Sequence, residues 1–319
     1  MKFSRRALLT VPLATLLLAS CAREKPDERI VLGFSQIGAE SEWRTANTES
    51  IKTAAATMNI DLRFADAQQK QENQIKALRT FIAQKVDVIA FSPVVATGWD
   101  TVLREAKGAG IPVILTDRAV TSDPSLYVGF LGSDFIEEGR KAGRWVSETF
   151  KDATTDVNIV ELQGTVGSAP ANDRKTGFEE VIAANPHLKI IRSQSGDFTR
   201  AKGKETMEAI LKSESRKMHV LYAHNDDMAI GAIQAIEEAG FRPGKDIFIV
   251  SIDAVKGAFE AMIAGKLNAT IECNPLLGPQ LMTSVAEVVA GRPIPKRIVV
   301  EETMFTMDTA KQYIQTRKY

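Results

Sequence analysis

The sequence predicts an α/β protein with two similar lobes, each a parallel sheet covered by helices on both faces. The chain has 319 residues, 44% of them hydrophobic and 25% charged. This composition is typical of globular proteins, and the length suits two lobes of about 150 residues each. Short apolar segments alternate with longer amphipathic ones along most of the chain. Strands that alternate with helices in this way form parallel sheets.

The alternation occurs twice. Strands of the first lobe are predicted at residues 30–34, 60–64, 86–91 and 111–115, and those of the second lobe at 157–162, 188–193, 220–223 and 247–252. Helices are predicted at 43–58, around 75–82 and 102–106, and at 174–184, 200–212 and 226–239, several with apolar residues three or four positions apart. The segment 126–131 is predicted to be a strand that leaves the first sheet. Gly240 is predicted to end the helix before it.

The first twenty residues have the pattern of an export signal. Three basic residues precede an apolar run at 7–19, which is too short to cross a hydrocarbon core of about 30 Å comfortably. The run ends in Leu18-Ala19-Ser20-Cys21, which matches a bacterial lipobox. We therefore expect removal of residues 1–20, a polar tether at 21–29 and an extracytoplasmic protein anchored by lipid on Cys21. An ordinary signal with an incidental cysteine is the alternative, and the general and twin-arginine export routes both stay open.

Composition excludes several classes of function. The 40 basic and 40 acidic residues balance, so we expect no nucleic-acid partner. None of the three histidines has the spacing of metal ligands, so we expect no metal, no cofactor and no catalytic centre. If Cys21 is acylated, Cys273 has no partner, and no disulfide is expected.

Polar side chains follow the predicted strands at their carboxyl ends, where open parallel sheets bind ligands. The candidate binding residues are Trp43, Arg44, Asp117, Arg118, Arg174, Asp197, Asn225 and Asp253. Some of the acidic and amide side chains could instead cap the following helices, but a helix amino terminus disfavours arginine. Carboxylates and guanidinium groups bind hydroxyls, and an aromatic ring can cover the C–H face of a sugar, so this set suits a polyhydroxylated ligand. His224 is expected to be structural.

Longer motifs resemble the type I periplasmic sugar-binding proteins of ABC importers, and within that class the galactofuranose binders. The matching segments are GFSQ (33–36), ES-WR (40–44), QQKQENQIK (68–76), SPVVATGW (92–99), VELQGTVG (160–167), RSQSGDFTR (192–200) and YAHNDDM (222–228). The resemblance extends over about residues 31–270.

The resemblance implies a two-lobed type I periplasmic-binding-protein fold with three hinge crossings, near 131–133, 272–275 and 301–304. The lobes would be 30–132 with 275–302, and 133–274 with 303–319. It implies sugar contacts from Trp43, Arg44, Asp117, Arg118 and Arg174, and ring-hydroxyl contacts from Asn225 and Asp253. Asp197 would lie near the site. The family's last contact follows the strand at 269–271, which makes Glu272 a candidate, although residues 272–275 depart from the family's pattern there.

The implied function is capture of a monosaccharide, galactofuranose, and its delivery to an ABC permease and its ATPase subunit by a monomeric protein. Two alternatives stay open. One is a lipid-anchored sugar sensor that signals to a membrane kinase or chemoreceptor, and the other is an exported carbohydrate enzyme. A repressor is disfavoured, because an export signal stands where a DNA-binding segment would precede the lobes.

Overall fold

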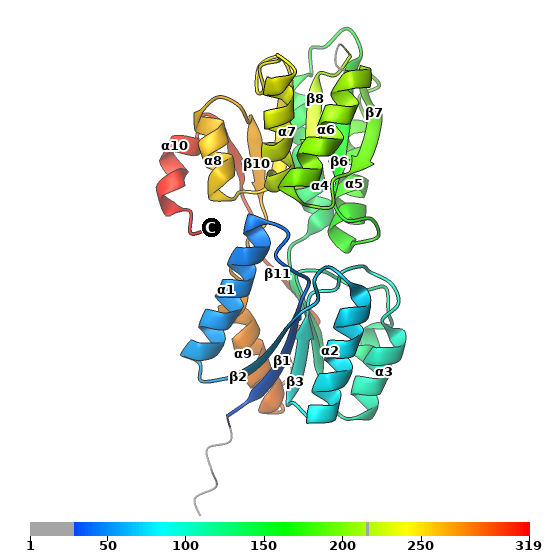
Figure 1. Cartoon of the computed structure of the whole chain (residues 1–319), viewed down its shortest axis with the longest axis vertical. Coiled ribbons are helices and arrows are strands. Elements are labelled where there is room, and N and C mark those ends of the chain that lie inside the picture. Colours follow the sequence, from blue (N-terminus) through cyan, green and yellow to red (C-terminus); the bar gives the residue numbers. More distant parts are fainter. Residues whose placement is uncertain (1–28, 215–216) are drawn as a thin grey trace, which may run out of the picture.

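The computed structural model describes residues 29–214 and 217–319, and places a six-stranded sheet in each of two stacked lobes (Figure 1). The N-terminal lobe contains β1 (Val31–Gln36), β2 (Asp61–Asp66), β3 (Val88–Phe91), β4 (Val113–Thr116), β5 (Gly129–Gly132) and β11 (Arg297–Val299), all parallel, in the order β11-β5-β4-β3-β1-β2. The C-terminal lobe contains β6 (Val157–Gln163), β7 (Leu188–Ser195), β8 (Val220–Ala223), β9 (Phe248–Asp253), β10 (Ala269–Glu272) and β12 (Met304–Thr306), in the order β12-β10-β9-β8-β6-β7. Only β12 is antiparallel to its neighbour among these strands. The predicted fold class is confirmed.

Helices cover both faces of the N-terminal sheet because alternate strand residues point to opposite sides. Val88 and Ala90 of β3 pack in one apolar cluster with residues of α1 (Glu42–Thr57) and α9 (Gly278–Val289). Ile89 and Phe91 pack in another with residues of α2 (Gln71–Gln84) and α3 (Asp100–Gly108). The C-terminal lobe has a single large core and the helices α4 (Phe135–Thr149), α5 (Ala169–Ile182), α6 (Arg200–Glu214), α7 (Asp226–Glu238), α8 (Lys256–Ile263) and α10 (Ala310–Tyr313). In the described part of the chain, no helix has the length and apolar character needed to cross a membrane.

The chain passes between the two sheets three times, at residues 133–134, 273–277 and 300–303. The strand predicted to leave the first sheet at 126–131 does not do so. As β5, it pairs with β4 and β11 inside the N-terminal sheet, and its residues Phe130 and Leu131 are buried there. The chain leaves this lobe only after β5 ends. The export signal and Cys21 lie outside the described residues.

Helix ends follow the local sequence. Ser41 caps α1 by accepting a hydrogen bond from the backbone N–H of Arg44, and Asp134 caps α4 in the same way. Gly240 follows the end of α7 with a φ of +83°, which agrees with its predicted role as the residue that ends this helix.

Candidate functional site

A polar cavity lies between the lobes, at the carboxyl ends of strands from both sheets. The space between its lining atoms, including the part open to solvent, is about 290 Å³. The lining residues are Glu40, Ser41, Trp43, Arg44, Asp117, Arg118, Phe135, Pro170, Arg174, Phe198, Asn225, Asp253 and Cys273. Seven of the nine binding residues predicted from the sequence are therefore brought together.

Arg44 holds two carboxylates of the N-terminal lobe in place. It follows the cap of α1, and its Nε donates to Glu40 Oε1 at 3.0 Å and its Nη2 to Asp117 Oδ2 at 2.7 Å. Burial opposes the charge on Arg44, but the attraction of Asp117 and Glu40 outweighs burial and raises the pKa of the guanidinium. Asp117 also accepts from Ser92 Oγ at 2.8 Å and has a φ of +63°, a conformation unusual for a non-glycine residue. Strained backbone of this kind is concentrated at functional sites.

Arg118 is less completely paired than Arg44. Its Nη1 donates to the carbonyl of Val94 at 3.0 Å, but its nitrogens lie 3.8 Å from the nearest oxygens of Asp117 and Glu40. Its Nε and Glu40 Oε2 are buried and have no hydrogen-bond partner among the described residues. Burial and the positive charge of Arg44 lower the pKa of Arg118 to about 10. Two residues of the cavity lining therefore each have an unpaired polar atom, a donor on Arg118 and an acceptor on Glu40.

Arg174 is the main charged group of the C-terminal lobe. Its Nε donates to Glu138 Oε2 at 2.7 Å, its Nη1 donates to the carbonyl of His224 at 2.6 Å, and its Nη2 lies 3.7 Å from Asp253 Oδ1. Burial opposes its charge, but Glu138 together with Cys273 and Asp253 outweighs burial and raises the pKa of Arg174. Burial raises the pKa of the Asp253 carboxyl well above its usual range.

Two glycines allow α4 and α5 to approach closely enough for this pairing. A Cβ atom at Gly139 would lie 2.2 Å from the carbonyl oxygen of Arg174, and one at Gly177 would lie 2.0 Å from that of Ile136. No side chain larger than hydrogen fits these distances. The helices can therefore present Glu138 and Arg174 side by side.

Aromatic rings supply the apolar part of the cavity. The indole N–H of Trp43 donates to the carbonyl of Cys273 at 2.6 Å, which ties the N-terminal lobe to the second crossing. Trp43 also packs with apolar residues of the C-terminal lobe, so it belongs both to the cavity wall and to the packing between lobes. The ring of Phe198 lies 5.1 Å from the guanidinium carbon of Arg118. A side chain at residue 164 would overlap this ring, so the position of Phe198 depends on Gly164.

Two of the predicted binding residues do not line the cavity, and a third lines it but also caps a helix. Asp197 is half-buried, hydrogen-bonds to Ser195 and does not line the cavity. Glu272 faces away from it, toward Arg317 at 2.8 Å and the hydroxyl of Tyr319. Asn225 does line it, but its side chain also caps α7 by accepting from Met228 N.

His224 lies behind the cavity wall and is buried, with its ring 3.0 Å from Glu161, in agreement with the structural role predicted for it. Sequence reasoning did not select six of the lining residues, namely Glu40, Ser41, Phe135, Pro170, Phe198 and Cys273. Glu40, Ser41 and Phe198 lie within motifs that carry the family resemblance, so a signal for them was present.

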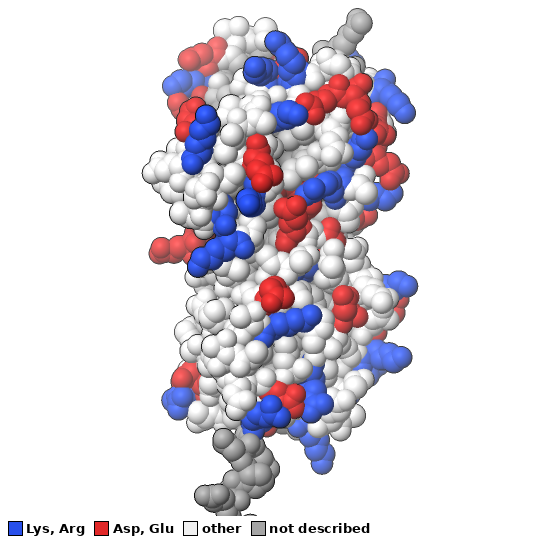
Figure 2. Space-filling model, turned by 60° about the vertical axis from the view of Figure 1, so that its left-hand side comes forward, with Lys and Arg blue, Asp and Glu red and all other residues white. Residues whose placement is uncertain are grey.

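The electrostatics of the molecule agree with a small-molecule site. On the face shown in Figure 2, positive and negative side chains of the described residues are interspersed over both lobes. Charge is instead concentrated inside, where three arginines and the carboxylates of Glu40, Asp117 and Asp253 line one cavity. Such a site can hydrogen-bond a neutral ligand through donors and acceptors at once.

Comparison with known proteins adds independent support. Residues 32–293 match the model of the periplasmic binding protein domain. The galactofuranose-binding protein YtfQ of Escherichia coli is 46% identical over 98% of both chains. A protein from Mycobacterium smegmatis solved with β-D-fucofuranose is 57% identical, with a TM-score of 0.89 over 91% of this chain and 95% of its own.

The periplasmic binding protein of an arabinose ABC transporter from Shewanella sp. ANA-3, bound to α- and β-L-arabinofuranose, is 50% identical. Its TM-score is 0.87 over 90% of this chain and 95% of its own. These relatives are described as binding proteins or sugar complexes, as expected for a chain that is not an enzyme. The resemblance seen in the sequence motifs is confirmed, and the chain belongs to the periplasmic binding protein family.

Proposed function

We propose that this protein captures a monosaccharide in its furanose form, galactofuranose, between its lobes and delivers it to an ABC importer. One observation carries the proposal. Arg118 Nε and Glu40 Oε2 are a buried donor and a buried acceptor without partners in the described chain, and both residues line the same cavity. An unpaired buried polar group costs about 1–3 kcal/mol, and a ligand hydroxyl can both accept from the arginine and donate to the carboxylate.

The remaining cavity residues suit the rest of a sugar. Asp117 and Asp253 can accept from hydroxyls on opposite lobes, and the rings of Trp43 and Phe198 can cover the C–H faces. A wrong epimer would leave at least one of these buried groups unpaired, which gives stereochemical discrimination. The furanose form is supported by the relatives, whose names and complexes specify galactofuranose, fucofuranose and arabinofuranose.

The two-lobed architecture supports delivery to a transporter. A ligand that contacts both lobes favours the closed arrangement in proportion to its differential contacts, and three short crossings can act as the hinge. The closed form would dock on a permease whose ATPase drives import. The relative from Shewanella sp. ANA-3, described as a component of an ABC transporter, supports this role.

The sugar is tested by calorimetric titration of the exported protein with galactofuranose, galactopyranose, arabinose and ribose. We expect saturable binding of one sugar per chain, tightest for galactofuranose. Tighter binding of galactopyranose would overturn the furanose assignment, and conversion of any sugar to product would favour the enzyme alternative. Delivery is tested with the permease and ATPase reconstituted in liposomes, where the loaded protein should stimulate ATP hydrolysis.

We also propose that the mature protein is held at the membrane by lipid on Cys21. The motif Leu18-Ala19-Ser20-Cys21 and the polar stretch after it support this anchor. Cys21→Ser should move the protein from the membrane fraction to the soluble fraction, whereas Cys273→Ser should leave its location unchanged. A wild-type protein that is already soluble and begins at another residue would contradict the anchor.

A further inference from the structure

The three crossings between the lobes meet at one side chain, that of Glu302. Glu302 lies on the third crossing, and its Oε1 accepts from the backbone N–H of Asn274 on the second crossing at 3.1 Å. The same oxygen accepts a short hydrogen bond from Ser133 Oγ on the first crossing. Ser133 Oγ also lies 3.4 Å from the sulfur of Cys273. The hinge is therefore tied together by an acidic side chain.

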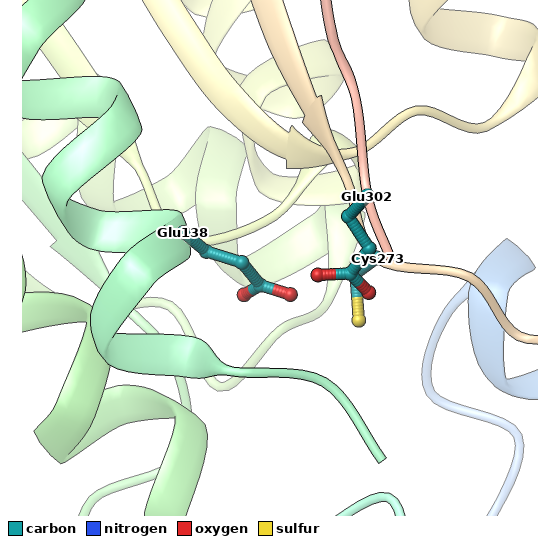
Figure 3. A group of neighbouring side chains, drawn as sticks. All are labelled: Glu138, Cys273 and Glu302. Atoms are coloured by element: carbon teal, nitrogen blue, oxygen red, sulfur yellow. The ribbon is translucent and has the colours of Figure 1, made fainter. Parts of the chain in front are cut away.

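A second acid points into the same place from α4. Figure 3 shows the carboxyl group of Glu138 directed toward Cys273 and Glu302. One ligand atom from each of these three residues lies within 4.8 Å of the others. Glu138 is 1% exposed, and its Oε1 has no hydrogen-bond partner among the described residues, while its Oε2 is held by Arg174. A buried, oriented and unpaired carboxylate oxygen beside a thiol and a second carboxyl is the donor set of a metal site.

We propose that Glu138, Cys273 and Glu302 bind a zinc ion at the hinge, next to the sugar cavity. A thiolate with carboxylates suits zinc, and three protein ligands plus one open position is a usual zinc arrangement. The carboxylates are already oriented from outside, Glu138 by Arg174 and Glu302 by Asn274 and Ser133, as in established metal sites.

Charge and access both agree with this assignment. Burial raises the pKa of the Glu138, Glu302 and Cys273 side chains, so a bound ion has to displace their protons. Once the three ligands are ionised, a divalent ion and the guanidinium of Arg174 balance their charge. Cys273 lines the sugar cavity, so an ion can reach the cluster from an open cleft. Bond lengths of about 2.0–2.3 Å place tetrahedral zinc ligands about 3.5 Å apart, so rotation of the two flexible glutamates has to contract the cluster by about an ångström.

The test uses sugar-free exported protein carrying Cys21→Ser, so that Cys273 is its remaining cysteine. After treatment with a chelator, the protein is titrated with Co²⁺ and then with Zn²⁺. We expect one cobalt ion per chain, with a near-ultraviolet absorption from sulfur-to-cobalt charge transfer, and displacement of cobalt by zinc. Absence of this absorption at saturating cobalt overturns the proposal without any further variant.

Two variants locate the site. Cys273→Ser should abolish the charge-transfer absorption, and Glu302→Gln should weaken zinc binding at least about tenfold while the thiol remains. Glu205→Gln, on the exposed surface of α6, serves as the matched control and should bind zinc like the parent. Each variant is first checked by circular dichroism and melting temperature without metal. Equal zinc binding by parent and Glu302→Gln would place the ion elsewhere and refute the site.

Discussion

Replacement of Arg118 by alanine tests the binding site most sharply, because the structure revises the reason for its effect. In the sequence Arg118 directly follows Asp117, which suggests that its guanidinium is shared between this carboxylate and a sugar hydroxyl, and that its removal would leave Asp117 uncompensated. The structure instead pairs Asp117 with Arg44 at 2.7 Å, while Arg118 lies 3.8 Å away. Arg118→Ala therefore removes a cation with an unpaired donor, and leaves the carboxylate with its stronger partner.

The expected loss of affinity can be estimated from the atoms that Arg118 has available. Its Nε is unpaired, and its Nη2 has only the distant contact to Glu40. One or two charge-assisted hydrogen bonds to a sugar, each about 1.5–3 kcal/mol, give a loss of about 1.5–6 kcal/mol, or roughly tenfold to more than ten-thousandfold. Burial and Arg44 lower the pKa of Arg118, which means that the fold disfavours the charge on this side chain. Its removal should therefore lower the free energy of unfolding of the sugar-free protein only little.

The assay is calorimetric titration of wild type and variant with galactofuranose, together with thermal unfolding of the sugar-free proteins. Arg292→Ala is the control, because Arg292 is exposed, pairs with Glu287 and lies outside the cavity. Affinity within about threefold of wild type, combined with a large fall in melting temperature, would show that Arg118 supports the fold and does not bind sugar.

Three further predictions concern packing, pH and closure. Trp43→Ala should weaken sugar binding by about 1–3 kcal/mol through lost apolar contact. Trp43→Phe keeps a ring against the sugar and should retain more of the affinity, while loss of the hydrogen bond to Cys273 should lower the free energy of unfolding by about 1 kcal/mol. Equal losses of affinity measured by calorimetry would contradict this division. Burial opposes ionisation of Glu161, but hydrogen bonds from His224 and Ser193 and the charge of Lys175 lower its pKa to about 2. Ionised Glu161 should therefore contribute ~3 kcal/mol to the free energy of unfolding. This contribution should be present above about pH 4.5 and lost toward pH 2. The difference in unfolding free energy between wild type and Glu161→Gln should shrink over that range, and a constant difference would contradict the assignment. Small-angle scattering should show a smaller radius of gyration with saturating galactofuranose, and an unchanged radius would argue against hinged closure.

Most of the fold could be predicted because the spacing of apolar residues and the length of each segment distinguish its strands from its helices. The main strands are short, apolar and buried, and the main helices are amphipathic. The elements that were not predicted include the helices α4, α8 and α9 and two short strands at sheet edges. β11 and β12 have three residues each and are partly exposed, so they carry little apolar signal. The segment around β5 lies next to a crossing, and the sequence does not show on which side of the crossing its hydrogen bonds are made.

The site could be predicted where a residue follows a strand and carries a charge. Asp117 directly follows β4 and Asp253 ends β9, and both line the cavity, whereas Arg174 reaches it from within α5. Phe135 and Pro170 could not be selected, because apolar residues at the start of a helix resemble core residues in sequence. Sequence position does not determine which of two neighbouring side chains faces the site. The carboxylate of Glu272 points toward Arg317, while its neighbour Cys273 lines the cavity.

A crystal structure of the protein with galactofuranose would show directly whether the sugar binds between the lobes. We expect one sugar there, with its oxygens within about 3 Å of Arg118 Nε and Glu40 Oε2. We also expect contacts to Asp117 on one lobe and to Arg174 or Asp253 on the other. A sugar bound outside this cavity, or one in the cavity that leaves both Arg118 Nε and Glu40 Oε2 without a partner, would contradict the account.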